Sequence, residues 1–180
     1  MNKLAIASIA ALAMTAAPAA MAEADTYVSL GYSMYSDDDA TLGAGTARFG
    51  AFFNEYFGLE GEASVGFDSD DITDAGTGVT VNVDLGYQVG GFGVVRFQPV
   101  EKLTFMGRAG YSMMSIRGSS GPVSETFDID GFAAGLGAQL QVTDRFAIRG
   151  DYTRFEADDD VIDGGLNTFT ISAVLTLNGN

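Results

Sequence analysis

Six charged residues interrupt segments in which apolar residues alternate with small or polar ones. All six share the small, polar parity: Arg48, Glu60, Glu62, Arg108, Arg149 and Asp151. Each lies about four to seven residues from a short polar turn, so a closed sheet would gather them at a similar depth on one face. Buried ions are costly unless they are paired, which predicts one network of opposite charges. Such a network is either a structural plug or a gate in a narrow pore. We favour the plug because eight strands rarely leave an open channel.

Residues suited to catalysis are scarce. The chain has no histidine and no cysteine, and Lys102 is the only lysine after residue 22. Nucleophilic chemistry without histidine or cysteine would need a lysine or carboxylate base. We therefore expect no enzyme, no catalytic residue and no cofactor.

Polar segments between the alternating ones hold much of the acid. The prominent positions are Asp37, Asp38, Asp39, Asp68, Asp70, Asp71, Asp74, Asp158, Asp159 and Asp160. Oxygen ligands suit Ca²⁺ or Mg²⁺, but the run from Asp68 to Asp71 lacks the glycine and distal glutamate of an EF-hand loop. We expect a solvated, self-repelling surface and no metal site; the alternative is weak bridging through divalent ions to neighbouring phosphate groups.

The ends and the charge narrow the class of protein. Residues 1–22 have a basic start, an uncharged run and a small-residue Ala-Met-Ala site, which predicts a cleaved secretory signal peptide. Residues 23–180 then form one domain, without a further apolar run near the ~20 residues of a transmembrane helix. The net charge of −15 becomes −16 without Lys3, so nucleic acid is not expected as a partner.

The elements that must position the charged residues are β-strands. Residues 46–67 set the pattern, with one apolar face that includes Phe49, Leu59 and Val65, and one polar or small face. Eight such segments are expected, at 27–35, 46–53, 57–67, 79–97, 103–114, 132–142, 146–155 and 167–177, with a bulge or bend at Gly90-Gly91. The apolar face would be the core of a soluble barrel, or would meet lipid in a transmembrane one.

The connections favour the membrane. Short turns at 54–56, 98–102 and 143–145 alternate with longer stretches at 36–40, 68–78, 116–125 and 156–166. Short turns at one end and long loops at the other are typical of outer-membrane barrels. A soluble lipocalin-like carrier would instead turn its apolar face inward, and the ionic residues on the other face argue against it.

A family resemblance points the same way. The stretches 47–67 (ARFGAFFNEYFGLEGEASVGF), 94–114 and 135–160 resemble the OmpA/opacity-type family of small Gram-negative surface barrels. The resemblance implies an all-β, eight-stranded, antiparallel up-and-down transmembrane β-barrel with long extracellular loops and short periplasmic turns. The chain departs from the family pattern at its last strand, which ends VLTLNGN rather than on an aromatic residue.

The function that the resemblance implies is structural. We expect a bacterial outer-membrane protein that stabilises the envelope, with or without a narrow passive pore. The alternative is adhesion or cell contact through the exposed acidic loops. The expected partners are outer-membrane lipid, lipopolysaccharide and the outer-membrane assembly machinery, and the expected state is a monomer.

Aromatic residues near the segment ends fit the interfacial girdles of such a barrel. They are Tyr32, Tyr56, Phe57, Phe97, Phe105, Tyr111, Phe146, Tyr152 and Phe155. Arg154 has the lipid-facing parity; either it reaches lipid phosphates or a bulge changes its register.

Overall fold

The computed structural model describes residues 24–36, 41–67, 69–73, 80–120, 123–157 and 165–178, all within one β-sheet and its turns. The predicted leader, residues 1–22, lies outside the described residues. The strands are β1 (Asp25–Ser36), β2 (Thr41–Phe52), β3 (Phe57–Gly66), β4 (Ser69–Thr73), β5 (Thr80–Val100), β6 (Leu103–Ser120), β7 (Val123–Gln141), β8 (Phe146–Ala157) and β9 (Gly165–Asn178). Among these residues, no helix has the length and apolar character needed to cross a membrane.

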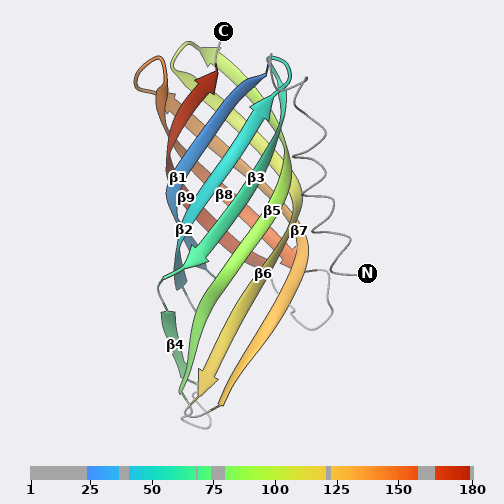
Figure 1. Ribbon diagram of the computed structural model, residues 1–180, viewed down its shortest axis with the longest axis vertical. Helices are drawn as coiled ribbons and strands as arrows, with labels where there is room; N and C mark the ends of the chain where they lie inside the picture. The colour runs from blue at the N-terminus through green and yellow to red at the C-terminus, as the bar shows by residue number, and fades with distance from the viewer. Residues whose placement is uncertain are drawn as a thin grey trace.

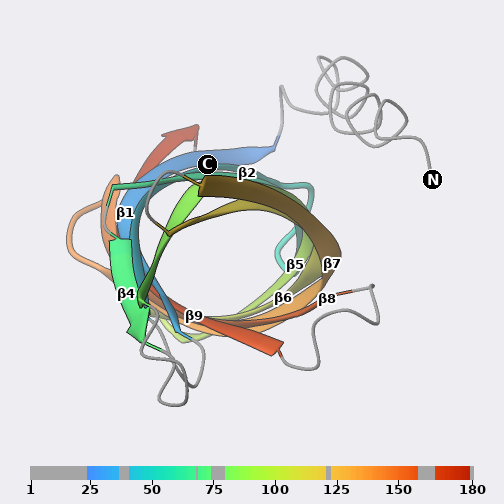
Figure 2. The same cartoon turned by 90° about the horizontal axis from the view of Figure 1, so that it is seen from below.

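The sheet closes on itself as an antiparallel barrel (Figures 1 and 2). Strands that are neighbours in sequence pair with one another, except β3 and β4; β1 pairs with β9, and β3 pairs with β5 to complete the ring. β3 and β4 both pair with β5, one after the other, so together they fill a single strand position. The prediction of an eight-stranded, up-and-down barrel is confirmed.

The two ends of the barrel differ, as the connections predicted. The turns β2–β3, β5–β6 and β7–β8 lie at one end, which we call the turn end and which is uppermost in Figure 1. The opposite end is called the loop end. There, β5, β6 and β7 extend well beyond their neighbours, and β4 adds a short strand to the edge of β5 (Figure 1).

Two predicted loops are therefore partly strand. The stretch 68–78 contains β4, and most of 116–125 belongs to the long β6–β7 hairpin, whose pairing runs from Leu103 with Leu140 to Ser120 with Val123. Outside a bilayer no lipid face imposes alternation, so these polar residues form strands without the expected pattern.

Side chains alternate between a buried interior and an apolar outer surface. On the outer face Leu30 is 70% and Leu136 73% exposed, whereas Arg149 on the inner face is fully buried. The apolar face thus points outward, as in a transmembrane barrel and opposite to a soluble carrier.

The bulge in the membrane-facing part of β5 is not where the sequence predicted it. The pairing of β5 with β6 is regular at Gly90 and Gly91, and the register shifts between Leu85 and Tyr87. Gly86 is the additional residue of this bulge, and it inverts the parity of everything before it. As a result Leu85, expected on the lipid face, is buried inside the barrel at 2% exposure.

Candidate functional site: the interior charge network

Strand register brings the six predicted charged residues to one level of the interior. Arg48 on β2 is directly opposite Glu62 on β3, and Gly50 is opposite Glu60. Arg149 and Asp151 are alternate residues of β8 and so share its inner face. Arg108 reaches the same level from β6. We call these six residues the charge network.

The charge network is continuous across the barrel. Glu62 accepts hydrogen bonds from Arg48 Nε at 2.6 Å and Arg108 Nη1 at 2.7 Å. Asp151 accepts from Arg48 Nη1 at 2.7 Å and Arg149 Nε at 2.8 Å. Arg149 Nη1 in turn donates to Glu60 at 2.7 Å. Arg48 and Arg149 therefore connect carboxylates on different strands.

The charge network is electrically balanced and buried. It contains three arginines and three carboxylates, and five of the six residues are no more than 4% exposed. Removing ions from water costs several kcal/mol per ion, which is repaid only when each finds partners. A balanced, multiply bonded set satisfies that condition, whereas removing one member would leave an unpaired buried charge.

Tyr27 is a member of the site that the sequence analysis missed. Its hydroxyl donates to Glu60 Oε2 at 2.5 Å, and the hydroxyl oxygen accepts a hydrogen bond from Arg149 Nη1 at 3.3 Å. The ring lies over Gly50, where a Cβ would collide with it. An inward-parity aromatic opposite a glycine was the available signal, because glycine lets a neighbouring ring cross the lumen.

Arg108 also has an aromatic partner. Its guanidinium carbon lies 3.6 Å from the centroid of the Phe92 ring, and Nη1 is 3.3 Å from Glu60 Oε1. The ring face is electron-rich and supports a cation placed over it.

Toward the loop end, the lumen is filled by a polar and then an apolar layer. Ser33 Oγ lies 2.6 Å from Thr46 Oγ1 and 2.7 Å from Thr170 Oγ1. Tyr35 donates to Gln88 Oε1 at 2.8 Å. Buried apolar residues come next, among them Leu42, Leu85, Met114 and Phe155. Phe155 is only 4% exposed, so its assignment to an interfacial girdle was wrong; alternation from Asp151 places it inside.

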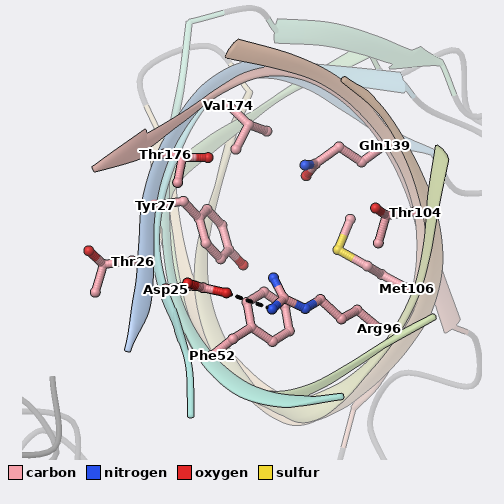
Figure 3. A pocket seen from close by; sticks show the side chains of 10 residues that line it. All are labelled: Asp25, Thr26, Tyr27, Phe52, Arg96, Thr104, Met106, Gln139, Val174 and Thr176. Atoms are coloured by element: carbon pink, nitrogen blue, oxygen red, sulfur yellow. Dashed lines mark hydrogen bonds and ion pairs between the residues drawn. The ribbon is translucent and has the colours of Figure 1, made fainter. Parts of the chain in front are cut away.

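Toward the turn end, a small cavity of about 50 Å³ lies beside Tyr27 (Figure 3). Arg96 donates from Nη2 to Asp25 at 2.8 Å, and its guanidinium carbon lies 4.0 Å from the Phe52 ring centroid. Tyr27 and Phe52 are themselves stacked, with centroids 5.9 Å apart. The turn-end mouth is thus narrowed by an ion pair and two rings.

The other predicted residues fall on or beyond the barrel surface. The predicted girdle residues Tyr56, Phe57, Phe97, Phe105 and Tyr152 are exposed on its outside. The backbone of Asp70 and Asp71 lies in β4, opposite Val83 and Asn82 of β5. The remaining acidic-loop positions lie outside the described residues: Asp37, Asp38, Asp39, Asp68, Asp74, Asp158, Asp159 and Asp160.

An apolar exterior, a closed antiparallel sheet and a buried polar interior define a small transmembrane β-barrel. The family model of the outer membrane protein beta-barrel domain matches residues 5–176. The chain belongs to this family, and it is a protein of the bacterial outer membrane.

Solved structures of small outer-membrane barrels share the fold. Ail, the attachment invasion locus protein of Yersinia pestis, crystallised with the heparin analogue sucrose octasulfate, is 20% identical over 86% of this chain and 99% of its own, with a TM-score of 0.60. OprG from Pseudomonas aeruginosa is 11% identical over 87% and 97%, with a TM-score of 0.63. Neisserial surface protein A is 10% identical over 86% and 97%, with a TM-score of 0.59. No curated protein matches the sequence significantly.

Proposed function

We propose that the protein is a structural component of the outer membrane, and that its lumen is sealed and does not conduct solutes. The observation that carries this proposal is the charge network, which joins β2, β3, β6 and β8 across the interior. An ion crossing the barrel would have to break several buried charge-assisted hydrogen bonds. The apolar layer on one side and the Arg96–Asp25 pair on the other add two further obstacles.

The proposed role involves no catalysis. The polar interior residues engage one another rather than a cleft, and neither histidine nor cysteine is present in the sequence. The buried carboxylates are held between arginines, which suits cohesion more than proton transfer to a substrate.

A test in the native bacterium separates sealing from transport. Deletion of the gene is expected to increase leakage of periplasmic proteins and sensitivity to detergent, while the uptake rate of small hydrophilic solutes stays unchanged. Complementation with the wild-type gene should restore the barrier. Reduced solute uptake with an intact barrier would instead indicate a pore.

Adhesion through the loop end is the second candidate. Its support is the projecting part of β5–β7, where the β7 residues before Gly131 pair with β6 and have no partner on β8 among the described residues. Given the net charge of −15, we propose that a partner at this end is basic, in contrast to the polyanionic analogue bound to Ail. Binding of cells to a host surface that survives deletion of all four loops would exclude this candidate.

A further inference from the structure

Positive charge is scarce in this chain, and most of it is already engaged. Three arginines belong to the charge network and Arg96 pairs with Asp25. Lys102 and Arg145 lie at the turn end, and Lys3 lies outside the described residues. Of the nine lysines and arginines, this leaves only Arg117 and Arg154 in the half of the barrel nearer the loop end, which we call the loop half.

Arg154 lies on the outer face, where the apolar band ends. Outward-facing residues of β8 run from Phe146 through Ile148 and Tyr152 to Arg154, so the guanidinium comes directly after an interfacial tyrosine. On the neighbouring strand, Arg154 is opposite Asn167, one outward position beyond Phe169. Tyrosine marks the headgroup level of a bilayer. Arg154 is therefore at the height of the outer-leaflet headgroups.

Neighbouring side chains hold the Arg154 guanidinium in position without engaging all of its N–H donors. Arg154 Nη1 donates to Asn167 Oδ1 at 3.2 Å, and Tyr152 donates to the same oxygen at 2.7 Å. Glu156 approaches Arg154 Nε at 3.4 Å in a pair whose side chains are 49% and 73% exposed. Such an exposed pair is weak. Gly165 provides the space that the Arg154 guanidinium occupies, because a Cβ at position 165 would come within 2.6 Å of Arg154 Nη2.

We propose that Arg154, Asn167 and Tyr152 form a site for a phosphate group of the anionic glycolipid in the outer leaflet, lipopolysaccharide. A planar guanidinium binds phosphate through two parallel N–H donors, and Arg154 offers its exposed edge at headgroup height. The chain is otherwise strongly acidic, so this cation is where the barrel attracts the phosphates of the lipid around it. The site is independent of whether the lumen conducts.

Arg117 provides the matched control. It is also an outward arginine of the loop half, with its side chain 55% exposed, but it lies on the projecting part of β6 and faces Asp84 at 3.8 Å. If net charge alone attracted the lipid, removing either arginine would have the same effect. The proposed geometry predicts that removing Arg154 weakens lipid binding and that removing Arg117 does not.

The experiment is a titration of the full chain, folded in detergent, with purified lipopolysaccharide, read by native mass spectrometry. Relative to wild type, Arg154→Gln is expected to bind about tenfold more weakly, as befits the loss of a charge-assisted contact. The affinity of Arg154→Lys should lie between those of wild type and Arg154→Gln, and the affinity of Arg117→Gln should stay within twofold of that of wild type. Gel mobility of unboiled samples verifies that each variant is folded.

Two further arms identify the source of the phosphate. Dephosphorylated lipopolysaccharide should bind wild type as weakly as the intact lipid binds Arg154→Gln, and millimolar inorganic phosphate should not compete. Equal affinities for wild type and Arg154→Gln, or equal losses in the Arg154 and Arg117 variants, would overturn the proposal. Competition by inorganic phosphate alone would overturn the assignment to lipid.

Discussion

Glu60→Gln is the sharpest perturbation of the charge network, because it removes one charge with almost no change in volume. Glu60 accepts from Arg149 and Tyr27 and lies 3.3 Å from Arg108. The network would change from three positive and three negative groups to three and two. Leaving one buried charge unpaired costs about 3–5 kcal/mol, so we expect the free energy of unfolding to fall by that amount.

A second substitution tests whether the loss comes from charge. Arg149→Met should also cost about 3–5 kcal/mol alone. The double variant restores charge balance, so its loss should be smaller than the sum of the two single losses by more than 1 kcal/mol. Ser29→Ala is the matched control, since Ser29 is buried opposite Arg48 and its hydroxyl has no hydrogen-bond partner among the described residues. It should change stability by less than about 1 kcal/mol.

Urea unfolding in lipid vesicles would provide these energies. The chain has no tryptophan, so circular dichroism and the mobility of unboiled samples on gels should be the readouts. Additive losses for Glu60→Gln and Arg149→Met, or a loss below about 1 kcal/mol for Glu60→Gln alone, would refute the idea of a coupled network.

Three other substitutions test the interior, each by the same unfolding assay. Leu85→Ala should cost about 2–4 kcal/mol because Leu85 is buried behind the Gly86 bulge; a loss below about 0.5 kcal/mol would mean that Leu85 faces lipid. Gly50→Val should displace the Tyr27 ring and lower the free energy of unfolding by at least about 2 kcal/mol. An equally large loss in Tyr27→Phe would instead assign the lost stability to the tyrosine hydroxyl. Asp25→Asn should cost less than about 1 kcal/mol, since the Asp25–Arg96 pair is partly exposed; a larger loss would show that the pair is structural.

The interior could be predicted from sequence because alternation is a strong signal in a barrel that has lipid on one side. A shift by one residue would place Arg48 or Arg149 in lipid, so the parity of those strands is strongly constrained. The pairings between network members follow from that parity and from the short turns, which fix the register. This is why all six charged residues could be identified together.

The errors have physical causes. A bulge adds one residue without a marked composition, so the position of Gly86 could not be distinguished from that of Gly90-Gly91. The residue type of Phe155 is typical of an interfacial girdle, whereas its alternation with Asp151 places it inside the barrel. The projecting part of β6 and β7 has no lipid contact to enforce alternation, so its polar sequence predicts a loop although it forms a hairpin.

The most direct test of the sealed lumen is ion conductance of the purified full chain in planar bilayers. We expect wild-type protein to give no current above that of empty membranes. The charge-balanced double variant Arg48→Ala with Glu62→Ala, which removes a directly opposed pair, should give measurable current if it folds to the same gel mobility. Reproducible single-channel steps from the wild-type protein would contradict the account.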